Sequence, residues 1–353
     1  MARVPPPLPR FQPMHPRRLL RCAAAWSEEE PWLFVHGDST ARALYFDLAT
    51  LLNRSVHAVL ADEVHPGHAA NFSTNCARME SRPPLHRRKC SAFELSAPLP
   101  TVRTPYAAGA LAAGTLATAE ASRSDGRIKR RLLKQVHARR LRLSFRLKAF
   151  GWESDLDERI LSELEQSPRL PDALIVGFGL WDMQYPPGFD PPSSGTPMLG
   201  AASAAALRRA GLVAFNASAR RYVRALSGVL RRGAAQGAAQ GAAQGAAQGA
   251  AQGGSLANGG KGRRRRTTRL LFLRVGALSS ERLPPWKRSH MDSELSVQYS
   301  AILSDAIAPY GWRMLDTFSS GASHPEESPD GVHYPGRISH YHTHLMLNAI
   351  CES

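Results

Sequence analysis

The chain has 353 residues, 43% of them hydrophobic, so it is long enough to bury a sizeable core. It contains no run of about 18 apolar residues, which excludes a transmembrane helix. The formal net charge is +16, but most of the basic residues are scattered arginines, with one run at residues 263–266. We therefore predict a solvated basic surface and no nucleic-acid partner, with an anionic partner such as a glycan as the alternative.

Apolar runs predict strands, 3.6-residue periodicity predicts helices, and the two alternate along the chain. The predicted strands are residues 32–35, 56–60, 141–150, 173–176, 270–275 and 314–315. The predicted helices are residues 41–52, 127–140, 155–165, 201–230, 297–308 and 339–350. The rest of residues 53–125 is predicted to be loop. This order predicts a doubly wound, flavodoxin-like, mostly parallel sheet between two helix layers, with the active site at the carboxyl ends of the strands.

Two of the predicted strands differ in pattern. Residues 173–176 are apolar throughout, which is typical of a central parallel strand that is buried on both faces. Residues 141–150 alternate between apolar and polar side chains, which predicts one exposed face and a place at or near the sheet edge.

Residues 1–28 form a Pro/Arg-rich lead-in that we expect to be disordered or loosely packed. Residues 29–353 are predicted to form a single domain. A low-complexity insert at residues 233–268 interrupts it, with five GAAQ repeats followed by the arginine run. Glycine at every fourth position weakens a helix, and the repeat holds nothing that forms a core, so we predict a flexible insert.

Cysteines and sequons bear on the compartment. The four cysteines allow three pairings: Cys76 and Cys90 would close a local loop, and Cys22 and Cys351 lie near the two ends of the chain. Three N-glycosylation sequons begin at Asn53, Asn71 and Asn216. Both features favour the secretory pathway or Golgi lumen. No signal sequence is visible in the first residues, so a cytoplasmic protein with free thiols is the alternative.

Gly37, Asp38 and Ser39 stand between the first predicted strand and helix. A serine at such a turn is exposed at the sheet edge, and the helix N-terminus favours negative charge that develops there. A bare GDS motif is more often a helix N-cap, because a nucleophilic serine also needs a base.

A base is available near the end of the chain, where Asp330 precedes His333 by three residues. At this spacing the carboxylate can orient the imidazole and stabilise its positive charge. We expect Ser39 Oγ to lie within hydrogen-bonding reach of a His333 ring nitrogen, at ~3 Å.

Three segments carry a family resemblance: GDSTARALYFDL at residues 37–48, GLWDM at 179–183 and DGVHYP at 330–335. Together they resemble the SGNH (GDSL-like) hydrolases. The resemblance is closest to the PC-esterase branch, which includes plant trichome-birefringence-like polysaccharide O-acetyltransferases and an animal group of predicted acylesterases. The resemblance covers most of residues 32–350 and implies an SGNH-type three-layer α/β/α fold. It also implies Ser39 as nucleophile, His333 as base and Asp330 as its partner.

The middle segment departs from the family pattern, because Trp181 stands where SGNH hydrolases usually have an oxyanion-binding asparagine. SGNH hydrolases usually have another oxyanion donor, a glycine in the second of their conserved sequence blocks. This glycine has no clear counterpart here, and Gly151 is the nearest candidate. We assign the oxyanion to the Ser39 N–H and a second donor. The candidates for that donor and for lining the site are Arg42, Gly179, Trp181 and Asp182. A structural salt bridge between Arg42 and Asp182 is the alternative.

Five further histidines stand near these motifs. His340 and His344 share a helix face, but no third ligand accompanies them, so we expect no metal and no cofactor. For that pair and for His342 we expect solvated or capping roles. His36 precedes the serine turn and either lines the site or packs against it, and His324 belongs to no motif.

The sequence thus predicts a serine acyl-ester hydrolase or O-acyltransferase that works through an acyl-enzyme. The resemblance implies acetyl esters of a glycan as the substrate. A catalytically degenerate glycan-binding protein is the alternative, because the middle-segment asparagine is missing.

Overall fold

The structure, a computed structural model, describes residues 31–52, 92–98, 140–189, 201–251 and 268–352. Six strands form one sheet in the order β2-β3-β1-β4-β5-β6. Their bounds are β1 Trp32–Gly37, β2 Ala92–Pro98, β3 Arg140–Leu147, β4 Ala173–Gly177, β5 Arg269–Leu273 and β6 Arg313–Leu315.

The strand order confirms the doubly wound prediction. The five strands β3-β1-β4-β5-β6 are parallel, and when they are numbered along the chain their order is 2-1-3-4-5, the flavodoxin-like order. Strand β2 adds one antiparallel edge beside β3. It lies in a stretch that the sequence predicted to be loop, so that part of the prediction is wrong.

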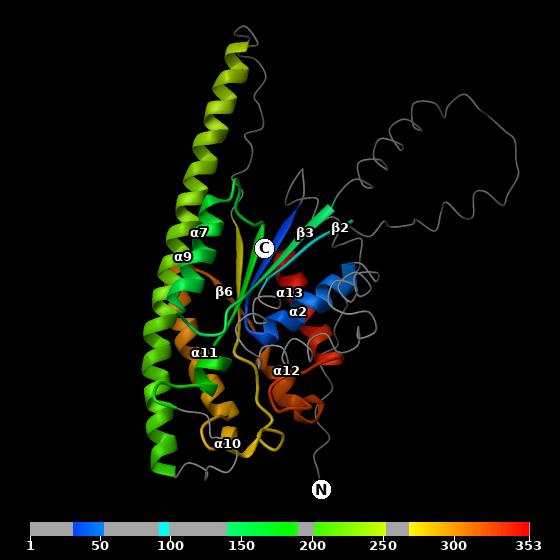
Figure 1. The fold of residues 1–353 in the computed structure, drawn as a ribbon. Coiled ribbons are helices and arrows are strands. Elements are labelled where there is room, and N and C mark those ends of the chain that lie inside the picture. The colour runs from blue at the N-terminus through cyan, green and yellow to red at the C-terminus, as the bar shows by residue number, and fades with distance from the viewer. Residues whose placement is uncertain (1–30, 53–91, 99–139, 190–200, 252–267, 353) are drawn as a thin grey trace, which may run out of the picture.

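Helices cover both faces of the sheet and make the predicted three layers (Figure 1). The helices on one face are α7 Ser154–Gln166, α9 Ala201–Ala251 and α11 Ser293–Ile307. The helices on the other face are α2 Ser39–Leu52 and α13 Arg337–Glu352. Shorter helices follow the strand ends: α8 Leu180–Gln184, α10 Pro285–Arg288 and α12 Phe318–Ser323.

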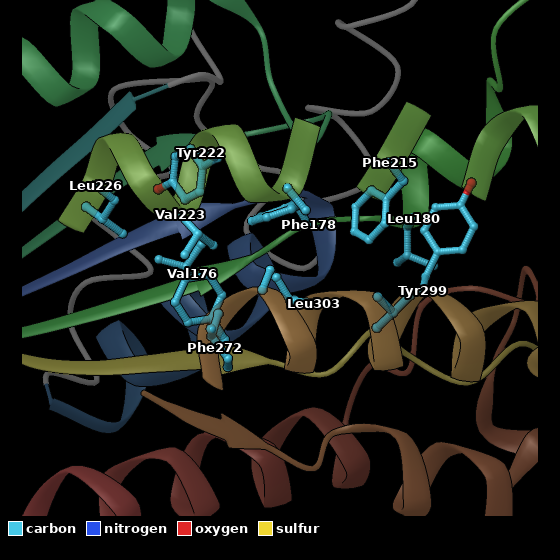
Figure 2. Close-up of a cluster of buried hydrophobic side chains, with 14 of the residues drawn as sticks. Val176, Phe178, Leu180, Phe215, Tyr222, Val223, Leu226, Phe272, Tyr299 and Leu303 are labelled. Carbon is cyan, nitrogen blue, oxygen red and sulfur yellow. The ribbon is translucent and has the colours of Figure 1, made fainter. Parts of the chain in front are cut away.

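Each face of the sheet has its own hydrophobic core, because successive side chains of a strand point to opposite faces. In β1, Trp32 and Phe34 belong to the core under α7, α9 and α11, whereas Leu33 and Val35 belong to the core under α2 and α13. Figure 2 shows the first core, in which side chains of β4 and β5 meet side chains of α9 and α11.

Strand β3 is one strand from the sheet edge, as predicted, but its polar face is not open to solvent. Ser144 and Lys148 are fully buried. The side chain of Arg146 bonds Glu163 of α7, and the guanidinium of Arg142 lies 4.1 Å from the ring centre of Trp32. The prediction of an exposed face is therefore wrong, because Trp32 and α7 cover it and the polar side chains find partners beneath them.

Helix α9 differs most from its prediction, because it continues through the GAAQ repeats as far as Ala251. Its first part packs against α7 and α11, so the repeats extend an existing helix and need no new nucleus. Ala and Gln are good helix formers, and the glycine in each repeat costs about 1 kcal/mol relative to alanine. The prediction of a flexible insert is wrong for residues 233–251, and residues 252–267 lie outside the described ones.

Several predictions fall on residues that the structure does not describe: the lead-in, the strand at 56–60 and the helix at 127–140. No helix in the described part of the chain is long and apolar enough to cross a membrane. Cys351 is disulfide-bonded, so its partner is one of the three cysteines outside the described residues.

Candidate functional site

Ser39 is the first residue of α2 and follows β1 through a turn that leaves no room for a side chain at Gly37. A Cβ at Gly37 would lie 2.3 Å from the Cβ of Ala41 and 2.6 Å from the carbonyl oxygen of Gly177. The Asp38 N–H donates to that same carbonyl at 2.9 Å and so ties the turn to β4. Glycine thus brings the start of α2 against the ends of two central strands.

Asp38 caps the helix that carries Ser39. Its Oδ1 accepts from the N–H and hydroxyl of Thr40 at 2.9 and 2.5 Å, and from the N–H of Ala41 at 3.4 Å. Burial raises the pKa of Asp38, and the bonds from Thr40 and Ala41 oppose that rise. Among the described residues, no acceptor bonds the Ser39 N–H. This N–H is a donor at a helix N-terminus, where anions bind favourably.

His333 and Asp330 meet Ser39 from the loop before α13. His333 Nε2 lies 2.6 Å from Ser39 Oγ, and His333 Nδ1 lies 2.6 Å from Asp330 Oδ2. Asp330 Oδ1 also accepts from the N–H groups of Val332 and His333, at 2.9 and 2.8 Å. The structure therefore brings the three predicted residues together in one hydrogen-bonded chain.

The environment of Asp330 keeps it ionised. Burial pushes its pKa upward, but the hydrogen bond from His333, the charge of His333 and the two backbone bonds outweigh burial and hold the pKa well below its usual range. An ionised carboxylate at Nδ1 fixes the tautomer in which Nε2 is free to accept the serine proton.

Gly331 fixes the loop between Asp330 and His333. It adopts a φ of +83°, which favours glycine, and a Cβ there would lie 2.7 Å from the Leu283 nitrogen. Its carbonyl accepts from the Ser279 N–H at 2.9 Å. The segment before α10 thereby holds the loop that carries the imidazole.

Asp182, in the middle segment, does not form the salt bridge with Arg42 that was the alternative. The Asp182 carboxylate accepts the Gly151 N–H with both oxygens, at 3.0 and 2.9 Å, and no bond to Arg42 is present among its contacts. Burial raises the pKa of Asp182 to about 7, against the bond from Gly151 and the charge of Lys148. Arg42 is buried and makes contacts of its own.

Gly151 was the candidate for the family's glycine donor, but its N–H and its carbonyl are both hydrogen-bonded within the protein. Asp182 takes its N–H, and the Lys148 ammonium donates to its carbonyl at 3.1 Å. Because its N–H already has an acceptor, Gly151 is not placed to bind an oxyanion. Trp181 lies next to this loop, with its ring 5.9 Å from that of Phe150. Gly179 adopts a φ of +120° and caps α8, a structural position.

A buried charged cluster lies beneath the serine turn, and apart from the residue types no sequence pattern indicates it. Lys148 donates to both oxygens of Asp157 at 2.8 Å, and its N–H donates to the carbonyl of Gly37 at 2.8 Å. Its ammonium lies 3.8 Å from the ring centre of Tyr222. Burial lowers the pKa of Lys148, and Asp157 opposes that shift.

His36 belongs to this cluster and not to the open site. It is fully buried, with Nδ1 2.7 Å from the hydroxyl of Tyr222 and Nε2 3.8 Å from Asp157. Burial, and then the charge of Lys148, lower its pKa well below the usual value. A neutral ring that accepts from Tyr222 and turns its Nε2–H toward Asp157 fits these contacts.

The other histidines lie apart from the triad contacts. The Nε2 atoms of His340 and His344 are 3.1 Å apart, and His342 Nε2 lies 2.5 Å from the Ser320 hydroxyl. One group in the described part of the chain has metal-ligand spacing: His324, Glu326 and Glu327. The two glutamates stand in no motif and were not among the predicted site residues. Arg337 bonds Glu327, so a cation already occupies that carboxylate.

Comparisons with known proteins leave the family open. No protein-family model matches the chain, and neither does any curated protein. A solved structure of a candidate GDSL-like lipase from Parabacteroides merdae aligns with 91% of this chain and 96% of that chain, at 9% identity and a TM-score of 0.37. A likeness this distant assigns no function. The fold and the site define a doubly wound α/β protein with a hydrogen-bonded Ser–His–Asp set at the carboxyl edge of its sheet.

Proposed function

We propose that this protein is a serine acyl-ester hydrolase of the SGNH (GDSL-like) type, with Ser39 as nucleophile. The observation that carries the proposal is the continuous chain from Ser39 Oγ through the His333 ring to Asp330, with both links at 2.6 Å. A base at hydrogen-bond distance from a hydroxyl, itself oriented by a carboxylate, is the arrangement that activates a serine.

The reaction has two halves. Ser39 Oγ attacks the acyl carbon while its proton passes to His333 Nε2. The ester C–O bond then breaks, and the leaving alcohol takes that proton. In the second half His333 accepts a proton from water, the water oxygen attacks the acyl-enzyme, and the carboxylic acid leaves as the proton returns to Ser39. Asp330 stays ionised throughout and stabilises the imidazolium.

The oxyanion needs donors aimed at the carbonyl oxygen. The Ser39 N–H is one, because it stands at the start of α2 with no acceptor among the described residues. For the second donor we propose Arg42 or Trp181, since the Gly151 N–H already bonds Asp182. An arginine would give the stronger, charge-assisted bond.

We propose more specifically that the protein transfers an acetyl group to a hydroxyl of a glycan, as the resemblance to the PC-esterase branch implies. This proposal rests on the sequence motifs at residues 37–48, 179–183 and 330–335. Hydrolysis and transfer share the same acyl-enzyme and differ only in whether water or a sugar hydroxyl attacks it. The alternative of a degenerate glycan-binding protein fits poorly with the bonded Ser–His–Asp set.

Hydrolysis of p-nitrophenyl acetate tests the proposal. The purified chain is expected to release p-nitrophenol above background, Ser39→Ala to abolish the release, and Ser203→Ala, an exposed serine on α9, to retain it. Equal rates in the wild type and Ser39→Ala would contradict the proposal. The molar ratio of released acetate to released p-nitrophenol distinguishes hydrolysis from transfer. A ratio near one indicates hydrolysis, and a ratio that falls when a sugar acceptor is added indicates transfer.

A further inference from the structure

Helix α9 carries an unbalanced charge. Its 51 residues include no aspartate or glutamate. They include seven arginines: Arg208, Arg209, Arg220, Arg221, Arg224, Arg231 and Arg232. The helix runs along one outer side of the fold, and its far end projects past the sheet (Figure 1). Such a helix presents a strongly positive surface wherever its neighbours do not neutralise it.

Three of the arginines are neutralised by adjacent elements. Arg221 and Arg232 pair with Glu158 and Glu165 of α7, and Arg208 pairs with Asp292, the cap of α11, at 2.7 Å. The protein thus supplies carboxylates along the flanks where α9 meets its neighbours.

The other four arginines form what we call the arginine stripe: Arg209, Arg220, Arg224 and Arg231. All four are exposed, and none pairs with a carboxylate among the described residues. Arg220 donates from Nε to Asn216 Oδ1, which leaves the outer nitrogens of its guanidinium available. The stripe is therefore a set of cations for which the described chain provides no counter-charge.

The four positions share one face of the helix. At 3.6 residues per turn, their directions fall within about 60° of one another, and at 1.5 Å per residue they extend over about 33 Å. The aromatic side chains of α9, Phe215 and Tyr222, are buried on the opposite side. Val213 is the large apolar side chain exposed on this face. The stripe is long, narrow and cationic.

We propose that the arginine stripe binds a linear anionic polysaccharide that carries sulfate or carboxylate groups. One guanidinium group can donate two parallel hydrogen bonds to one such oxyanion. A row of guanidinium groups about 33 Å long matches an extended chain with regularly spaced charges. The stripe shares no residue with the Ser39 site, and the proposal does not depend on the proposed activity.

Two other polyanions fit the stripe less well. Single-stranded nucleic acid is bound by exposed aromatic side chains as well as by cations, and the aromatic side chains of α9 are buried. A membrane-surface helix needs a broad exposed apolar face, and here that face packs on the sheet. The disulfide at Cys351 favours a compartment other than the cytosol and nucleus, where disulfides are rare, and this also counts against a nucleic-acid ligand.

The experiment measures binding of the full chain to heparin, as a sulfated polysaccharide probe, with a matched pair of variants. Arg220→Gln/Arg224→Gln removes two charges from the stripe, and Arg282→Gln/Arg313→Gln removes two exposed charges elsewhere. The stripe variant is expected to weaken binding at least about tenfold and to flatten its salt dependence, because fewer counterions are released. The control is expected to change binding less than about twofold.

Three outcomes would overturn the proposal. The first is an equal loss of binding in both variants, which would indicate attraction by net charge alone. The second is tighter binding to duplex or single-stranded DNA than to heparin at the same salt concentration, which would indicate a nucleic-acid surface. The third is tighter binding to phosphatidylserine vesicles, which would indicate a membrane surface. Thermal unfolding of both variants shows that any loss of binding is not a loss of fold.

Discussion

His333 Nε2 lies 2.6 Å from Ser39 Oγ, although the two residues are 294 positions apart in the sequence. The serine begins the first helix after β1, and the histidine lies on the loop before the last helix. Parallel strands of a doubly wound sheet end at the same edge, so both loops emerge there. The fold itself thus creates the proximity, and it places Asp330 on the far side of the imidazole.

Replacing Asp330 by asparagine tests the role of that carboxylate. Asp330→Asn is expected to lower kcat by about 10³- to 10⁴-fold with little change in KM, because the amide favours the wrong imidazole tautomer. Asp155→Asn, an exposed carboxylate on α7, is the matched control and is expected to leave kcat unchanged. Steady-state kinetics on p-nitrophenyl acetate measures both. A kcat for Asp330→Asn within threefold of wild type would remove Asp330 from the mechanism.

A methyl group at Gly37 tests the close approach of α2 to the strands. Gly37→Ala is expected to destabilise the fold by about 1–3 kcal/mol, because the new Cβ would overlap Ala41 and the Gly177 carbonyl. Gly276→Ala is the control, since a Cβ there meets nothing within 4 Å. Urea denaturation gives the free energy of unfolding for each. If the two variants are equally stable, the packing of this turn is not as tight as described.

Removing the buried lysine tests the cluster beneath the turn. Lys148→Met leaves Asp157 buried without its cation, so we expect a loss of about 3–5 kcal/mol in the free energy of unfolding. The double variant Lys148→Met/Asp157→Leu removes both charges and is expected to recover much of that loss. Chemical denaturation of the wild type and both variants makes the comparison. A double variant less stable than Lys148→Met would show that the two side chains do not act as a pair.

The raised pKa of Asp182 predicts a pH dependence of stability. Its folded pKa of about 7 lies above the ordinary value of 3.8, so the folded protein binds more protons than the unfolded chain between these values. The stabilisation is present below about pH 4 and is lost as the pH rises through about 7. Asp182→Asn keeps an acceptor for Gly151 but does not titrate. Between pH 5 and 8 the wild type is expected to lose stability relative to this variant.

Urea unfolding at both pH values measures this difference. Wild type and Asp182→Asn with parallel pH profiles would show that Asp182 titrates normally in the folded protein. Asp155→Asn again serves as the control, because its carboxylate is exposed.

The sequence predicts most of the parallel sheet because its strongest signals are local. Residues 173–176 are apolar throughout and form all of β4 except its last residue, and the periodic segment at 155–165 forms most of α7. Strand β2 was missed because its pairing with β3 depends on a distant partner and not on its own pattern. The length of α9 was missed because its packed first part supports the repeats that follow.

In the candidate site, too, local motifs could be predicted from the sequence, whereas contacts between distant residues could not. Ser39, Asp330 and His333 could be predicted because each stands in a short motif at a strand or loop end. The bond between Asp182 and Gly151, and the burial of Lys148 beside Asp157, could not. Both join polar residues from different loops or elements, and sequence spacing carries no information on which polar groups pair once they are buried.

Covalent trapping shows directly whether Ser39 is a nucleophile. A fluorophosphonate reacts only with a serine that is activated by a neighbouring base, and it needs no knowledge of the natural acyl group. We predict one adduct per chain, found by mass spectrometry on the peptide that contains Ser39 and absent from Ser39→Ala and His333→Ala. An unlabelled wild-type chain, or a label on another serine that persists in Ser39→Ala, would contradict this prediction.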